Sequence, residues 1–149
     1  MSVDYIVASL PPLDFDGPAP MTRERFDEIA RGIDLSGVAG KWRDLETQMR
    51  NAIAVARGGA RWQRPAKGCS VYWRGRAAAA FAEKDPMARE NALDRMWWDA
   101  AAEMAPPASP LSKGALFAYS VRLDVVLRRN RVARDAGREI VGGVVGGGQ

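Results

Sequence analysis

Few residues in this chain are of the types that carry out chemistry. The sequence contains no His, and Cys69 is its single Cys. A cysteine nucleophile needs a partner such as His to generate the thiolate, so Cys69 is interpreted as a structural or surface thiol. Zinc sites are built from Cys and His, and Asp14 and Asp16 lack the oxygen-rich pattern of a calcium loop. We therefore expect no metal site, no cofactor and no catalytic thiol.

Two other kinds of site need carboxylates or glycines at a set spacing. Glu90 and Asp94 are four residues apart, as a general acid and base on one helix could be. Any exposed helix shows the same spacing, and neighbouring arginines can neutralise the pair, so we interpret both as surface residues. Residues 58–70 lack the order of a phosphate loop, because Lys67 precedes Gly68. The sequence therefore predicts a protein that is not an enzyme and has no small-molecule substrate.

Aromatic and basic residues are interleaved between positions 61 and 76. Trp62, Tyr72 and Trp73 lie among several arginines and Lys67, a pattern that could stack on and neutralise a single strand of nucleic acid. In helical proteins, however, aromatic residues more often belong to the core. The net charge is only +4, and acidic residues are interleaved with basic ones elsewhere. A basic nucleic-acid-binding helical module is therefore the alternative function, and nucleic acid is not the expected partner.

Positive charge is most concentrated in residues 122–138, which contain six arginines and two aspartates. A solvated helix face is the favoured interpretation of such a run. The other interpretation is a surface for an acidic protein or a phosphate. The candidate residues for a partner contact are Arg122, Arg128, Arg129 and Arg131.

Length and composition describe one globular domain. The chain has 149 residues, of which 47% are hydrophobic and 27% charged, and it is long enough to bury a core. A single Cys indicates a reducing, cytoplasmic setting. Asp4 stands where a secretory signal would carry positive charge, and no apolar run approaches the length of a membrane span. We expect membrane association only through partners.

The most regular pattern begins at Asp85. Asp85 followed by Pro86 is a strong helix start, and prolines at 106, 107 and 110 enforce an elbow between two long amphipathic helices. Helices joined by such a short elbow form an antiparallel hairpin. A second apolar ridge, Val121 and Val125, follows the main stripe of the later helix. The residues expected in the core are Leu93, Met96, Trp97, Leu116, Tyr119, Leu123 and Val126.

The remaining elements are shorter. Residues 1–21 form a loop-rich segment in which 3–10 is either a strand or a helical turn; Thr22 begins a helix that ends at Gly32. Further helices are predicted from Asp34 or Ser36 to about 57 and from about 71, and Gly137 is expected to bend the last long helix. The fold class is all-α: a bundle of about five or six helices in a single domain, residues 1–141, with the hairpin and terminal helix in 85–141. Residues 142–149 are expected to be a flexible Gly-rich tail.

Two blocks of sequence resemble a known family. The opening DYIVASLPPLDFDGPAPMTRERF resembles the start of bacterial proteins whose genes lie within V-type ATP synthase operons. NALDRMWWDAAAEM, followed by SPLSKGALFAYSVRLDVVLRRNRVARDAGRE, resembles the C-terminal half of the same family. In the first block the resemblance is carried by Tyr5, Ala8, Ser9, Leu10, Pro11, Phe15, Asp16, Thr22 and Phe26.

The C-terminal half is also distantly similar to the end of the central-stalk socket protein of V/A-type ATPases, known as the C subunit and, in eukaryotes, as the d subunit. The matching positions are Pro110, Leu111, Ser112, Ala118, Tyr119, Asp124, Arg128 and Arg131. This socket protein is helical and non-catalytic and joins the rotor shaft to the proteolipid ring, although it is much longer than this chain. The resemblance implies an accessory or central-stalk component of a V-type ATPase. It implies partners among the subunits of the rotor shaft or proteolipid ring, and a cytoplasmic location peripheral to the membrane.

Overall fold

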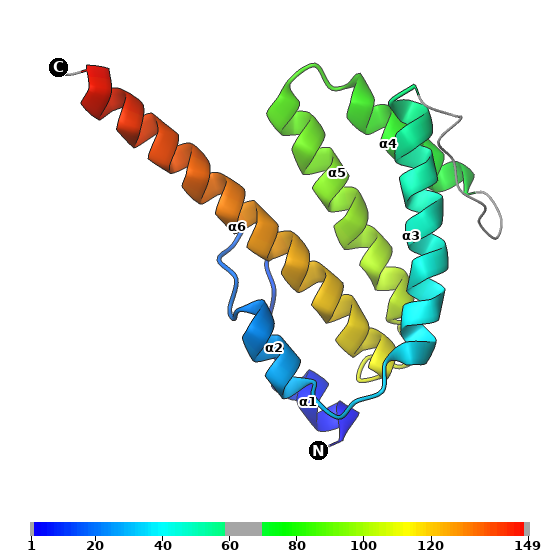
Figure 1. Ribbon diagram of the computed structural model, residues 1–149. Helices are drawn as coiled ribbons and strands as arrows, with labels where there is room; N and C mark the ends of the chain where they lie inside the picture. The colour runs from blue at the N-terminus through cyan, green and yellow to red at the C-terminus, as the bar shows by residue number, and fades with distance from the viewer. Residues whose placement is uncertain (1, 59–69, 148–149) are drawn as a thin grey trace.

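The computed structural model describes residues 2–58 and 70–147 (Figure 1). These ranges contain six α-helices, one short 3-10 helix and no strand, so the prediction of an all-α bundle of five or six helices is confirmed. The helices are α1 (Val3–Ser9), α2 (Arg23–Ile29), α3 (Ser36–Ala56), α4 (Val71–Ala82), α5 (Pro86–Ala101), η2 (Ala102–Met104) and α6 (Lys113–Gly147). None of these helices combines the length and the apolarity needed to cross a membrane.

Helices α3, α4 and α5 form the body of the molecule. Two of them begin at residues whose side chains cap the first turn: Ser70 Oγ accepts a hydrogen bond from Trp73 N, and an Asp85 carboxylate oxygen accepts one from Met87 N. Small residues let the three helices approach closely around a few large side chains. Their shared core consists of Trp42, Leu45, Met49, Ala52, Trp73, Ala77, Met96 and Ala100.

The N-terminal segment packs along α6. Residues 3–9 form helix α1, which decides between the two structures that the sequence left open for that run. Ile6 of α1 and Phe26 of α2 pack with Leu116 and Leu123 of α6. The proline-rich stretch 10–21 between the two helices is not helical, as its composition predicts. We call this stretch the strap, because it runs from α1 to α6 and back to α2 (Figure 1).

The antiparallel hairpin of α5 and α6 is present (Figure 1). Ser112 Oγ accepts a hydrogen bond from Ala115 N and so caps the first turn of α6. The expected bend at Gly137 is wrong, since α6 continues through that residue to Gly147. Residues 142–147 thus belong to α6, and the flexibility of the tail stays a prediction. The second half of α6 extends away from the rest of the molecule (Figure 1).

The predicted core is confirmed for Met96, Leu116, Leu123 and Val126, which are almost inaccessible. Leu93, Trp97 and Tyr119 are only partly buried. The fully packed tryptophan of α5 is instead Trp98, whose ring meets Phe15 of the strap edge-on at 5.5 Å between centroids. One side of α5 packs against α4 and the core side chains of α3, and the other side packs against α6 and the strap. The helix therefore needs two apolar faces. A single stripe therefore could not identify its most buried residues.

Candidate functional site

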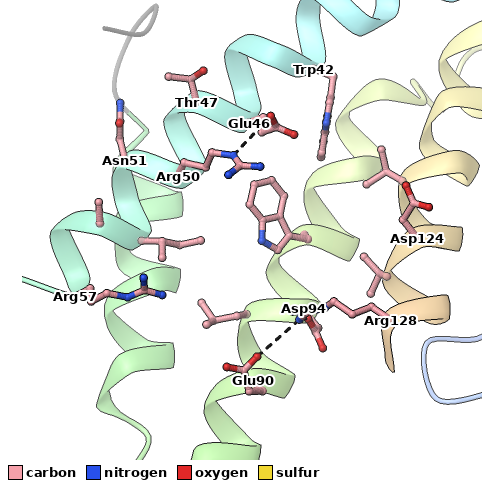
Figure 2. A pocket seen from close by; sticks show the side chains of 16 residues that line it. Trp42, Glu46, Thr47, Arg50, Asn51, Arg57, Glu90, Asp94, Asp124 and Arg128 are labelled. Carbon is pink, nitrogen blue, oxygen red and sulfur yellow. Dashed lines mark hydrogen bonds and ion pairs between the residues drawn. The ribbon is translucent and has the colours of Figure 1, made fainter. Parts of the chain in front are cut away.

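An open groove lies between α3 and α6, with α5 along its floor (Figure 2). Its volume is about 1100 Å³. Leu93 and Trp97 of α5 form part of the floor, and Val121 and Val125 of α6 contribute one wall. The opposite wall is the face of α3 that carries Ile53 and several polar residues. The lining of the groove therefore combines apolar and charged side chains from three helices.

Charged side chains line the rim of the groove and are mostly paired. On α3, Arg50 lies 3.6 Å from Glu46. On the other rim, Arg128 lies 3.7 Å from Glu90, and Asp124 lies 3.3 Å from an arginine of α2. These pairs are exposed, so each contributes little to stability and is free to exchange partners. The rim can consequently adapt to charges on whatever enters the groove.

Asp94 stands at the edge of the groove and is buried, with only 6% of its surface exposed. One of its oxygens accepts a hydrogen bond from Arg128, and the other lies 3.3 Å from Arg129 Nη1. The interpretation of Asp94 as a solvated surface residue is therefore wrong. Its burial follows from the hairpin, because α6 brings two guanidinium groups to the one carboxylate that α5 turns inward.

Arg129 joins the same cluster to the strap. Its Nε donates to the carbonyl oxygen of Phe15 at 3.1 Å, and its Nη2 donates to Asp16 at 3.0 Å. Its Nη1 also donates to Asn91 at 2.8 Å. The guanidinium carbon lies 3.9 Å from the centre of the Phe15 ring, within the range of a cation–π contact. Through these contacts, the Arg129 side chain links α6 to α5 and to the strap.

The four arginines predicted to contact a partner have different environments. Arg122 Nε donates to the carbonyl oxygen of Trp98 at 3.1 Å, its guanidinium lies over the Trp98 ring, and burial lowers its pKa. Arg128 and Arg129 come together at Asp94. Arg131 is exposed. The structure thus does not gather the four into one surface, and the two exposed members are Arg128 and Arg131.

The residues considered for chemistry have different environments. Glu90 and Asp94 both contact Arg128, and Asp94 also contacts Arg129, so two guanidinium groups balance the two carboxylates. Within residues 2–58 and 70–147, no group of three or more His, Cys, Asp or Glu side chains could hold a metal ion. Trp73 is buried in the core while Tyr72 is exposed, so these two aromatics do not form one stacking surface. Cys69, Trp62 and Lys67 lie outside the described residues.

The groove itself was not predicted from the sequence. Its one signal was the second apolar ridge of α6, Val121 and Val125, which a single packing face does not require. The comparisons add no assignment: no family model matches the chain, and neither curated proteins nor solved structures give a match. The resemblance to the V-type ATP synthase operon family therefore depends on the residues quoted for it.

Proposed function

We propose that this protein is a non-catalytic accessory or central-stalk component of a V-type ATP synthase and acts through contacts with other protein chains. The observation that carries the proposal is the groove. Its floor carries Leu93 and Trp97, which are only partly buried, and the buried carboxylate beside them, Asp94, is already paired with two arginines. A groove between helices that has apolar residues on its floor and charged residues along its walls can receive another helix.

The identity of the complex comes from the resemblance of the two sequence blocks, and the mode of action comes from the groove. A coupling or assembly component needs a stiff frame and a surface for docking, and it needs no reacting group. On this proposal the protein is cytoplasmic and reaches the membrane only through its partners. Its direct partners are subunits of the rotor shaft or of the proteolipid ring.

Co-elution with purified V-type ATP synthase tests the proposal. The full chain is mixed with the intact complex, and separately with its rotor-shaft subunits and its proteolipid ring, and each mixture is separated by gel filtration. We expect co-elution with the complex that persists at about 0.3 M salt, because apolar contacts are weakly screened. Failure to co-elute with all three preparations would contradict the proposal.

The same chain is tested for binding to single-stranded DNA, by fluorescence anisotropy at about 50 and 200 mM salt. A nucleic-acid-binding module would bind the DNA with an affinity that falls steeply over this range, because phosphate contacts release counterions. We expect no such binding. Strong, salt-sensitive binding without co-elution would favour the alternative function.

A further inference from the structure

The face of α6 that lines the groove continues beyond the body of the molecule. Val121, Val125 and Arg128 line the groove, at steps of four and three residues. The next positions on that face are Val132 and Ala136, again four residues apart, so they point in nearly the same direction from the helix. Val132 is 50% exposed and Ala136 is also exposed. Apolar residues on this face thus begin inside the groove and continue past Arg128 to the exposed part of the helix.

Residues 131–147 of α6 are here called the distal half. All side chains from 131 to 137 are exposed, and Figure 1 shows the distal half extending past the other helices. At 1.5 Å per residue its 17 positions span about 25 Å. The groove wall between Trp42 and Arg57 of α3 covers 15 steps, or about 22 Å. The projecting helix and the groove therefore have matching lengths.

We propose that two copies of this protein form a two-fold dimer in which the distal half of each α6 occupies the groove of the other copy. A continuous helix cannot fold back into its own groove, so the contact must be between copies. Because α6 also forms one wall of the groove, a two-fold axis near Asn130 would pair the two α6 helices antiparallel. Each copy would then give and receive the same surface, which closes the assembly at two chains.

The side chains on the two surfaces are complementary. Val132 and Ala136 of one copy would cover the floor of the other, Leu93 and Trp97, together with Val125. The distal half also presents exposed Arg131 and Arg134 on its flank. The groove lining also contains arginines, Arg50, Arg57 and Arg128. Glu90 and Asp124 on its rim have side chains that are more than half exposed, and their exposed pairs can exchange partners. Apolar contact at the centre with opposite charges at the edge is the usual anatomy of a specific interface.

Substitution of the exposed residue Val132 tests the proposal without disturbing the fold. Light scattering coupled to gel filtration measures the mass of the full chain and of Val132→Arg across a range of concentrations. We expect a dimer for the unsubstituted chain and a dissociation constant raised at least about tenfold by the substitution. Val71→Arg is the matched control, since Val71 is 82% exposed on α4, and it should remain dimeric.

A second pair of variants addresses the groove from α3. Ala54 lines the groove, whereas its neighbour Val55 does not and is exposed. Ala54→Arg should therefore weaken the dimer, and Val55→Arg should not, with circular dichroism confirming that both variants fold. A monomeric unsubstituted chain, or a dimer that is insensitive to both Val132→Arg and Ala54→Arg, would overturn the proposal.

Mixing the two weakened variants distinguishes reciprocal exchange from any other dimer. Val132→Arg keeps an intact groove, and Ala54→Arg keeps an intact distal half, so a mixed dimer regains one of its two contacts. We expect the mixture to contain more dimer than either variant alone at the same total concentration. Absence of this recovery would contradict the exchange. The outcome also bears on the proposed function, because a groove filled by a second copy could receive an ATP synthase subunit only after the dimer separates. Co-elution measured with Val132→Arg, which keeps the groove intact, distinguishes failure of the dimer from failure of the proposed function.

Discussion

At the scale of single residues, Asp94 is the point on which the internal charges converge. It is buried beside Arg128 and Arg129, and the Arg129 side chain is only 17% exposed. Breaking a buried ion pair from one side leaves the other charge without compensation. We expect Asp94→Asn to lower the free energy of unfolding by about 3 kcal/mol, measured by urea denaturation. Asn has nearly the same volume as Asp, so the substitution creates no cavity. The loss would come from the guanidinium groups that no longer have a carboxylate partner.

Asp27→Asn is the control for this substitution. Asp27 forms an exposed pair with Arg23 within α2, and such pairs contribute less than about 1 kcal/mol. Equal effects of the two substitutions would mean that Asp94 is better solvated than its position indicates.

The stabilisation that Tyr119 contributes through its contact with the strap depends on pH. Its hydroxyl donates to the carbonyl oxygen of Pro11 at 2.8 Å, and burial raises its pKa above the ordinary value of 10.0. Since the fold favours the neutral phenol, the stabilisation is fully present below about pH 10 and is lost as pH rises through the raised pKa. Tyr119→Phe should cost about 1 kcal/mol at pH 8, with a difference from the unsubstituted protein that shrinks above pH 10. Urea denaturation between pH 8 and 11 measures both.

Tyr5→Phe is the control for the loss of a tyrosine hydroxyl. Tyr5 is largely exposed, so its substitution should change stability little at every pH in this range. A Tyr119→Phe difference that stays constant up to pH 11 would contradict the role assigned to the buried hydroxyl.

At the scale of elements, Gly114 fixes the junction between η2 and the start of α6. A Cβ on this residue would overlap the carbonyl oxygen of Met104, a backbone atom that cannot move independently. We expect Gly114→Ala to lower the free energy of unfolding by about 3 kcal/mol, despite the better helix propensity of Ala. Gly40→Ala in α3 should instead stabilise by about 1 kcal/mol, because open space surrounds that position. Thermal denaturation of the two variants gives the comparison, and a stabilising Gly114→Ala would contradict this packing.

Most elements could be predicted because their signals are local. Thr22, Asp85 and Ser112 cap their helices through their own side chains, and prolines exclude helix from the strap. The attachment of the strap could not be predicted in this way. Asn130 accepts from Ala19 N and donates to the carbonyl oxygen of Gly17 across more than a hundred residues, and no local pattern encodes such a partner.

The candidate site shows the same division. The sequence placed Arg128 and Arg129 in a basic run, but charge alone does not distinguish a solvated arginine from one that satisfies a buried carboxylate. The packing of α6 against α5 brings both arginines to Asp94 and so distinguishes the two cases. Conversely, Val132 continues the apolar spacing of α6, and only the packing of the other helices decides whether it is buried or exposed. The sequence of α6 alone does not show where the other helices end.

At the scale of the whole molecule, α6 is one helix with two different environments. Its first half contacts α1, α2, α3 and α5, whereas residues 131–137 are exposed. The distal half also contains Gly137, Gly142, Gly143, Gly146 and Gly147, each about 1 kcal/mol less favourable in a helix than Ala. A helical segment of this composition gains little stability by itself, so its order should depend on being covered.

Hydrogen exchange measured by mass spectrometry tests this dependence. If a second copy covers the distal half, its amides should be protected well above the dimer dissociation constant and should exchange at least about tenfold faster well below it. Amides of residues 116–126 should keep their protection at both concentrations, because intramolecular packing holds them. In Val132→Arg the distal half should exchange quickly throughout. Equal exchange of the distal half at all concentrations would indicate that the helix is stable without a partner. It would contradict the proposal that a second copy occupies the groove.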